Sequence, residues 1–157
     1  MNIFSGGDVL QFAIRLEENG EAFYRRAAAT ADDRGVAELF SHLAEEEIKH
    51  KKIFQDLFSR VQWVEPAQTY EGEYLAYLKN YMDGKIVFSA DSKDELPEIN
   101  GTGAALDFAI QRELDSILYY QELKAFVAQK DFGSVDAIIA EERKHFALLS
   151  QAKKNYK

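Results

Sequence analysis

The sequence contains no cysteine, and this absence excludes several classes of protein at once. Without cysteine the chain can form no disulfide framework, no thiol nucleophile, no iron–sulfur cluster and no iron site built from four cysteines. Any metal ion must therefore be bound through oxygen and nitrogen atoms.

Long apolar runs and basic residues are also scarce. No apolar run approaches the roughly 18 residues that a membrane span requires, and the first residues lack the basic and apolar segments of a secretory signal. The net charge of −8 would repel the phosphate backbone of a nucleic acid. We therefore expect a cytoplasmic protein that has neither a membrane nor a nucleic acid as its partner.

The length of the chain fits one domain. With 157 residues, of which 46% are apolar, the chain can bury a core that needs no disulfide or structural metal to hold it. We expect a single domain over residues 1–157.

Only two prolines occur, Pro66 and Pro97, and both lie in the middle third of the chain. Two long stretches are therefore free of the strongest helix breaker. Helical periodicity predicts two long helices on each side of a connection from about residue 60 to 100. The expected helix starts are Asp8, Asp32 or Asp33, Thr102 and the turn at 131–134.

The helices are expected to bury one apolar face each. On the second helix this face is Phe40, Leu43, Ala44, Phe54 and Leu57. On the third helix it is Leu106, Ala109, Ile110, Ile117 and Tyr120. On the fourth helix it is Val135, Ile138, Ile139, Phe146 and Leu149.

Four tyrosines recur at helical spacing inside the long connection. They are Tyr70, Tyr74, Tyr77 and Tyr81. The spacing predicts a short amphipathic helix whose aromatic stripe packs against the bundle or against a second subunit.

The two halves of the chain are similar to each other. The segment FAIRLEENGEAFY from Phe12 aligns with FAIQRELDSILYY from Phe108, and EEIKH from Glu46 aligns with EERKH from Glu141. A helical hairpin is therefore duplicated. We expect an all-α four-helix bundle, made of two hairpins joined by a long crossover that contains a short helix.

The duplicated segments carry two Glu-x-x-His pairs. Residues three or four apart share one face of an α-helix, so Glu47 with His50, and Glu142 with His145, can each direct a carboxylate and an imidazole to one place. One such pair means little in a chain rich in glutamate. Two pairs in register with a duplicated glutamate helix indicate a metal site.

Glu17 and Glu113 lie within the apolar faces of the first and third helices, so we expect both to point inward. Four glutamates that face one core would repel each other unless they were protonated or bound to cations. Two divalent ions would cancel four carboxylates and leave open positions for a small oxygen-containing ligand. The predicted ligands of this dinuclear site are Glu17, Glu47, His50, Glu113, Glu142 and His145.

Neighbouring acidic residues offer alternative ligands. Glu18, Glu46 and Glu141 lie nearer the polar edges of their helices, whereas Glu21 lies close to the inward face and stays an open alternative. His42 has no partner at the right spacing, so we expect it at the surface.

These motifs resemble the ferritin-like domain of the rubrerythrin family over all four helices. The matching motifs are Glu-x-x-Gly-x-x-x-Tyr from Glu17 to Tyr24, Glu-x-x-Ser-x-x-x-Tyr from Glu113 to Tyr120, and Glu-x-x-His at Glu47 and at Glu142. The resemblance implies a ferritin-like bundle with two iron ions, and these ligand types would also suit manganese or zinc.

The resemblance also assigns a role to each residue. It implies that Glu47 and Glu142 bridge the two ions and that the terminal ligands are Glu17, Glu113, His50 and His145. Tyr24 and Tyr120 resemble family tyrosines that hydrogen-bond to ligand carboxylates, although ordinary core tyrosines would have the same spacing.

Two departures from the family pattern concern electron transfer and chemistry. Rubrerythrins carry a cysteine-ligated rubredoxin domain, so a chain without cysteine implies an external electron-donor protein. They also carry an extra glutamate where this chain has Ser116, which puts efficient peroxidase chemistry in doubt.

We therefore expect an oxidoreductase that reduces hydrogen peroxide or dioxygen, and that forms a homodimer or larger homo-oligomer. The alternatives are ferrous iron oxidation and iron handling, as in ferritins, and a non-catalytic bundle that binds a protein partner.

Overall fold

Four long helices and one short helix make up the fold, a computed structural model that describes residues 6–60, 64, 73–83 and 99–156. The long helices are α1 (Gly6–Thr30), α2 (Arg34–Arg60), α5 (Thr102–Leu123) and α6 (Phe132–Asn155). The short helix α3 (Glu73–Asp83) belongs to the connection between α2 and α5, and two 3-10 turns (Lys124–Phe126 and Gln129–Asp131) join α5 to α6.

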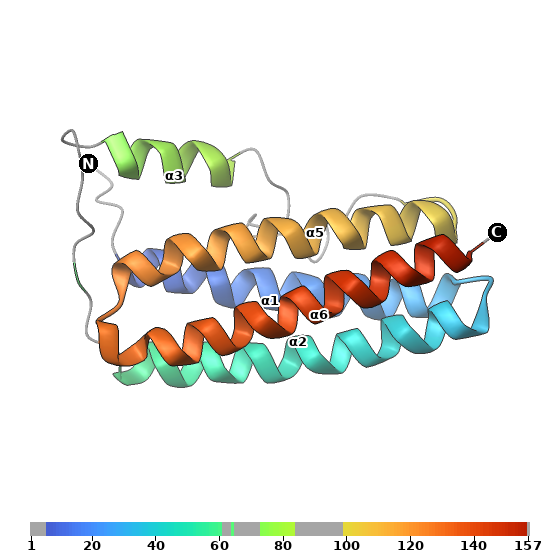
Figure 1. The fold of residues 1–157 in the computed structure, drawn as a ribbon, viewed down its shortest axis with the longest axis horizontal. Helices are drawn as coiled ribbons and strands as arrows, with labels where there is room; N and C mark the ends of the chain where they lie inside the picture. Colours follow the sequence, from blue (N-terminus) through green and yellow to red (C-terminus); the bar gives the residue numbers. More distant parts are fainter. Residues whose placement is uncertain (1–5, 61–63, 65–72, 84–98, 157) are drawn as a thin grey trace.

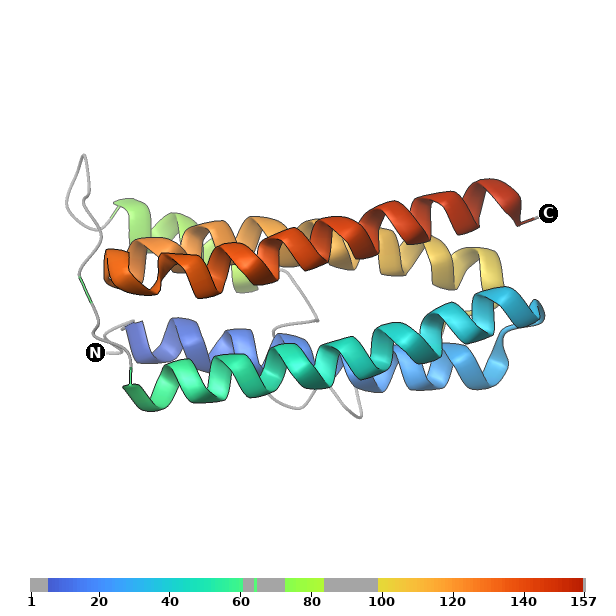
Figure 2. The same cartoon turned by 60° about the horizontal axis from the view of Figure 1, so that its bottom comes forward.

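The long helices form two antiparallel hairpins that pack into a four-helix bundle (Figures 1 and 2). In one hairpin α1 packs on α2, in the other α5 packs on α6, and the hairpins meet where α1 contacts α5 and α2 contacts α6. Because α2 ends at one end of the bundle and α5 begins at the other, the hairpins are joined by a crossover. The predicted ferritin-like fold is therefore confirmed.

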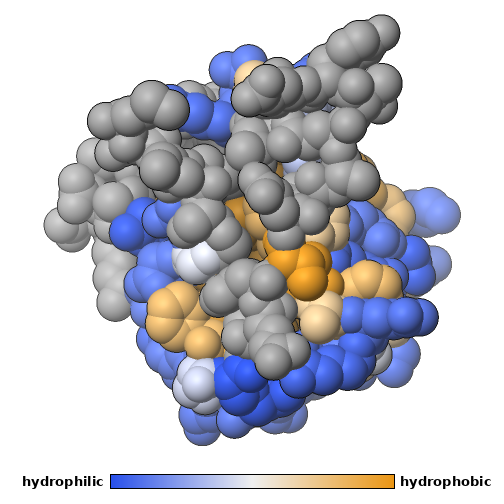
Figure 3. Space-filling view, turned by 90° about the vertical axis from the view of Figure 1, so that its left-hand side faces the viewer, coloured by the Kyte–Doolittle hydropathy of each residue, from blue (hydrophilic) through white to orange (hydrophobic). Residues whose placement is uncertain are grey.

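Two apolar clusters fill the bundle, one toward each end. The first cluster includes Leu10, Phe54, Leu123 and Ile138, and the second includes Phe40, Leu106 and Leu149. Figure 3 shows the end of the bundle that the first cluster fills, where apolar residues gather near the middle and hydrophilic residues lie along the lower edge. The middle of the bundle, between the clusters, contains the charged side chains described below.

Helix starts were predicted with mixed success. Asp33 caps α2 as expected, because its Oδ1 accepts a hydrogen bond of 2.9 Å from the backbone N–H of Val36. The prediction for Asp8 was wrong: α1 begins at Gly6, so Asp8 lies in the first turn, where its charge still suits the helix dipole.

Thr102 was wrongly predicted to cap the third helix. It is the first residue of α5, and the capping position is taken by Gly101 at φ 95, a backbone conformation that glycine adopts without steric cost. The Thr102 hydroxyl instead accepts a hydrogen bond from the backbone N–H of Asp32, so it ties the start of α5 to the α1–α2 turn. The last helix begins at Phe132, inside the predicted turn at 131–134 and not after it.

The buried face of the third helix is rotated from the predicted one. Leu106, Ala109 and Tyr120 are buried as expected, but Ile110 and Ile117 are only half-buried. The buried face instead includes Arg112 and Ser116. The prediction selected apolar residues only, so it placed Ile110 and Ile117 on the buried face and missed Arg112. Phe146 on the fourth helix is likewise half-buried rather than in the core.

The predicted tyrosine helix exists as α3 and packs on the outside of α5 (Figure 1). The hydroxyl of Tyr81 donates a hydrogen bond of 3.0 Å to the backbone carbonyl of Asp115, and the hydroxyl of Tyr74 bonds the side chain of Glu122. Tyr77 is exposed, and Tyr70 lies outside the described residues. No helix in the described part of the chain is long and apolar enough to cross a membrane.

Candidate metal centre

The six predicted ligand residues lie together in the middle of the bundle, and each is at most 2% exposed. They come from all four long helices: Glu17 from α1, Glu47 and His50 from α2, Glu113 from α5, and Glu142 and His145 from α6. Their burial follows from helix geometry, because the three-residue spacing places the carboxylate and imidazole of each pair on one face.

These residues form two overlapping groups that could each hold a metal ion. One group is Glu17, Glu47, His50 and Glu142, and the other is Glu47, Glu113, Glu142 and His145. Within each group, one ligand atom of every residue lies within 4.8 Å of the others. Glu47 and Glu142 belong to both groups, so the arrangement could hold two ions that share two carboxylates.

The two histidines face the two oxygens of one shared carboxylate. Nδ1 of His50 lies 2.8 Å from Oε1 of Glu142, and Nδ1 of His145 lies 3.5 Å from Oε2 of the same residue. The imidazole rings are stacked, with centroids 5.6 Å apart. Each oxygen of Glu142 is therefore directed toward a different group, which is the arrangement that a bridging carboxylate needs.

Tyr24 and Tyr120 each hold one carboxylate of the opposite hairpin. The hydroxyl of Tyr24 on α1 donates a hydrogen bond of 2.5 Å to Oε1 of Glu113 on α5. The hydroxyl of Tyr120 on α5 donates to Oε1 of Glu17 on α1. In both glutamates the hydrogen bond takes Oε1, and Oε2 has no hydrogen-bond partner among the described residues.

Buried polar atoms without hydrogen-bond partners gather at this site. Within the described part of the chain they include the following ligand atoms: Oε2 of Glu17, of Glu113 and of Glu142, Nε2 of His50, and Nδ1 of His145. Leaving such atoms unsatisfied costs free energy, and their convergence on one place needs an explanation. Oxygen and nitrogen donors of these types fit iron, manganese, zinc or cobalt.

The pKa values of the glutamates show how strongly they interact. Burial raises the pKa of Glu47 and of Glu113 well above the usual value, and neighbouring carboxylates raise both further, although Arg112 acts in the opposite sense. Burial would also raise the pKa of Glu142, but its contacts with Glu113, His145 and His50 outweigh burial and hold it well below the usual value. Unequal pKa values among like groups are typical of a site that binds protons or cations.

His50 responds to the same negative charge. Burial by itself would lower the pKa of His50, but the nearby carboxylates of Glu142 and Glu17 raise it to about 11. A metal ion bound by His50 must therefore displace a strongly held proton.

Arg112 is a member of the site that sequence reasoning missed. The residue is 2% exposed, and its Nη1 and Nη2 atoms donate hydrogen bonds of 3.1 and 3.2 Å to the two oxygens of Glu47. Nη2 also donates to the backbone carbonyl of Leu16 at 2.7 Å. The available signal was the internal duplication, in which Arg112 aligns with Leu16, so a charged residue stands where the other copy is apolar.

Gly20 makes room for this arginine. A Cβ atom at Gly20 would lie 1.9 Å from Nη2 of Arg112 and 2.8 Å from Oε2 of Glu47. The glycine of the Glu-x-x-Gly-x-x-x-Tyr motif therefore permits the close approach of a buried guanidinium to α1. In the other copy this position is Ser116, whose hydroxyl donates a hydrogen bond to the backbone carbonyl of Arg112.

The alternative ligands are engaged elsewhere. Glu18 pairs with Lys51 at 2.9 Å, Glu21 pairs with Arg25 at 3.0 Å, and His42 is exposed. Glu46 and Glu141 form a third possible group with His145, but both glutamates are only half-buried. The two fully buried groups are therefore the better candidates for metal binding.

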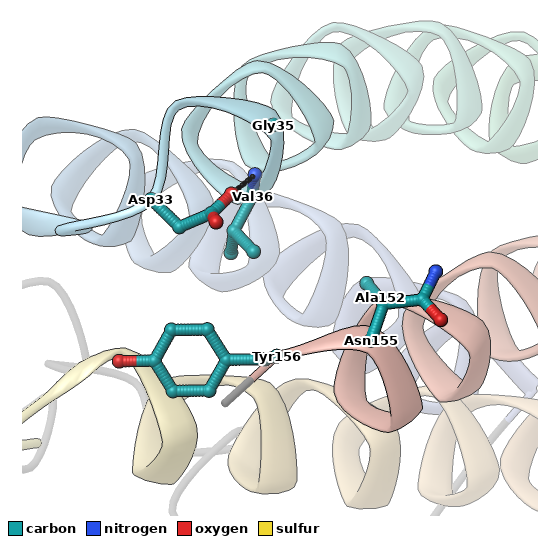
Figure 4. A pocket seen from close by; sticks show the side chains of 6 residues that line it. All are labelled: Asp33, Gly35, Val36, Ala152, Asn155 and Tyr156. Atoms are coloured by element: carbon teal, nitrogen blue, oxygen red, sulfur yellow. Dashed lines mark hydrogen bonds between the residues drawn. The ribbon is translucent and has the colours of Figure 1, made fainter.

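A separate pocket lies at the end of the bundle near the α1–α2 turn (Figure 4). Its lining residues are Asp33, Gly35, Val36, Ala152, Asn155 and Tyr156. None of them belongs to the glutamate and histidine cluster, so this pocket is not the candidate metal centre.

Comparisons with known proteins identify related chains. The family model described as rubrerythrin matches residues 8–153. A Thermotoga maritima protein described as a ferritin-like diiron-carboxylate protein has a similar crystal structure, with a TM-score of 0.68, 27% identity, and coverage of 98% of this chain and 97% of that chain.

The structure of a hypothetical protein from Pyrococcus furiosus is also similar, with a TM-score of 0.53 and 17% identity. The match covers 96% of this chain and 89% of that chain. At this identity the likeness concerns the fold alone. A search of curated proteins gives no match.

Proposed function

This chain belongs to the rubrerythrin family, and we propose that it is a redox protein that binds two iron ions in the buried cluster and reduces hydrogen peroxide or dioxygen. The observation that carries the proposal is the pair of buried ligand groups that share Glu47 and Glu142. A dinuclear site with shared carboxylates suits two-electron reactions of small oxygen compounds.

The six residues divide the work of holding the ions. Glu47 and Glu142, which belong to both groups, would be shared by the two ions. Glu17 and His50 would hold one ion, and Glu113 and His145 would hold the other. Two ferrous ions held there would supply two electrons, which together with two protons would reduce one peroxide molecule to two water molecules.

The surrounding side chains orient the ligands. Tyr24 and Tyr120 hold Oε1 of the two terminal glutamates, and burial together with the nearby carboxylates raises the pKa of both phenols well above the usual value. Both phenols therefore remain protonated hydrogen-bond donors. Such partners of metal ligands fix ligand orientation and contribute to metal affinity.

The electrons that restore the ferrous state come from an external carrier protein in this proposal, because a chain without cysteine can ligate no rubredoxin iron. Ser116 lies on the buried face of α5, one turn after Glu113, and it offers a hydroxyl where rubrerythrins carry a further carboxylate. We expect peroxide reduction to be slower than in proteins that have that carboxylate.

The test is metal content after anaerobic loading with ferrous iron. We expect about two irons per chain in the wild type and few in Glu47→Ala/Glu142→Ala, because the double substitution removes both shared ligands. Glu46→Ala/Glu141→Ala is the matched control: it removes the neighbouring glutamates and should retain both irons. Mass spectrometry measures the iron, and absorbance follows oxidation when peroxide is added.

The outcomes separate the proposal from its rivals. Equal iron retention in the wild type and in Glu47→Ala/Glu142→Ala would contradict the dinuclear site. Fast oxidation by peroxide with re-reduction by an added carrier supports the redox function, whereas oxidation by dioxygen followed by iron storage in a large hollow assembly, visible in the native mass, would favour iron handling.

A further inference from the structure

Arg112 breaks the symmetry of the duplicated site. The two hairpins contribute equivalent glutamates and histidines, but Arg112 aligns with Leu16 in the other copy. A guanidinium is protonated at every accessible pH, so it is a fixed positive charge among four carboxylates. The site therefore contains one permanent cation on one side only.

The contacts of Arg112 fall unequally on the two ligand groups. Its guanidinium bonds both oxygens of Glu47, which the groups share, and its Nη1 also lies 3.6 Å from Oε1 of Glu113, which belongs to the second group alone. Among the described residues, no ion pair joins Arg112 to Glu17 or to Glu142. The positive charge is thus nearer the group that contains Glu113.

The guanidinium has little freedom to move away. The backbone carbonyl of Leu16 accepts a hydrogen bond of 2.7 Å from Nη2, and the absence of a side chain at Gly20 leaves the space that the guanidinium fills. The ring of Tyr24 lies 5.6 Å from Cζ of Arg112. The guanidinium is therefore held in place as a permanent positive charge within the site.

We propose that Arg112 is a positioning residue that makes the two metal sites unequal. The group of Glu17 and His50 binds the first ion tightly, and the group of Glu113 and His145 binds the second ion more weakly. The cause is that Arg112 competes with a metal ion for Glu47 and Glu113 and repels a cation placed beside them. This inference rests on the proposal that both groups bind metal.

The experiment is a titration of the full chain with Co²⁺, because cobalt accepts carboxylate and imidazole ligands and its visible absorption reports its coordination. Calorimetry and absorbance should show two binding steps in the wild type. Arg112→Leu installs the residue of the other copy. In this variant we expect the dissociation constant of the second step to fall by at least about tenfold, because the repulsion between a unit charge and a nearby metal ion in a protein is larger than the free energy of a tenfold change.

Two variants separate the charge from other effects. Arg112→Lys keeps the positive charge and should restore unequal steps. Arg143→Leu removes an exposed arginine next to Glu142 in the sequence and should leave both steps unchanged. If Arg112→Leu folds only with cobalt present, the rates at which a chelator removes the two ions give the same comparison.

Histidine variants identify which group each step belongs to. His50→Ala should abolish the tight step, and His145→Ala should abolish the weak one. The reverse assignment would overturn the inference, as would two equal steps in the wild type or an unchanged second step in Arg112→Leu. If the wild type binds two ions and one of these results is found, only this inference is contradicted. If the wild type binds no metal, the proposed function is contradicted as well.

Discussion

At the scale of single residues, the guanidinium of Arg112 occupies the space that a side chain at position 20 would need. A Cβ atom at Gly20 would lie 1.9 Å from Nη2 and 2.4 Å from Cζ of Arg112, inside the contact distance of any two atoms. The guanidinium cannot easily retreat because Glu47 and the Leu16 carbonyl hold it. The glycine is therefore a packing requirement at this position, although glycine normally weakens the interior of a helix.

We predict that Gly20→Ala destabilises the fold by about 1–3 kcal/mol, the range for overpacked cores, instead of giving the usual gain from alanine in a helix. The midpoint of denaturant unfolding measures the change. Gly133→Ala is the matched control, because a Cβ there would meet nothing within 4 Å. Equal stabilities of the two variants would show that Arg112 does not occupy this space.

Helix α3 contacts the bundle through one buried leucine and two tyrosines named below. Leu78 is fully buried against the first apolar cluster, while Tyr74 and Tyr81 anchor the helix to α5 through their hydroxyls. The aromatic stripe predicted from the sequence is thus used for packing within one chain at these two tyrosines. Tyr77 of the same stripe is exposed, but its ring centroid lies 6.3 Å from that of Tyr74 and its hydroxyl donates a hydrogen bond of 3.4 Å to Oε1 of Glu122.

Leu78→Ala should lower the free energy of unfolding by about 2–5 kcal/mol, because it removes a buried side chain and leaves a cavity. Lys79→Ala, at an exposed position of the same helix, should change it by less than about 0.5 kcal/mol. Thermal or denaturant unfolding followed by circular dichroism measures both. A similar small effect for both substitutions would mean that α3 does not dock on α5.

At the scale of the whole molecule, the bundle has a charged middle between two apolar ends. The two apolar clusters lie on either side of the glutamates and histidines, so water has little access to carboxylates that repel each other. The stability of the bundle should therefore depend on the cations bound at its centre.

We predict that Co²⁺ at about one hundred times the dissociation constant of its tighter site stabilises the wild type by at least about 2.7 kcal/mol, which raises Tm by at least roughly 5–10 °C in a domain of this size. Removal of the ion with a chelator should reverse the change. Scanning calorimetry measures Tm, and Glu47→Ala/Glu142→Ala provides the control, since it lacks both shared ligands. A shift of equal size in that variant would show that cobalt acts elsewhere on the protein.

The sequence by itself determined the fold class and the set of candidate ligands. Helix geometry relates spacing to direction, so Glu-x-x-His on two helices and the aligned Glu17 and Glu113 are sufficient to predict one inward-facing cluster. The duplication supplied the pairing of the hairpins, because two copies of one hairpin pack most simply as a bundle.

Only the tertiary structure decided which groups touch across the hairpins. The hydrogen bonds of Tyr24 to Glu113 and of Tyr120 to Glu17, the hydroxyl of Thr102 on Asp32, and the bidentate contact of Arg112 with Glu47 all join residues far apart in the chain. Periodicity describes one helix at a time, so it cannot show which partner a polar side chain will meet. A buried arginine has a favourable place only after folding has brought a carboxylate to it.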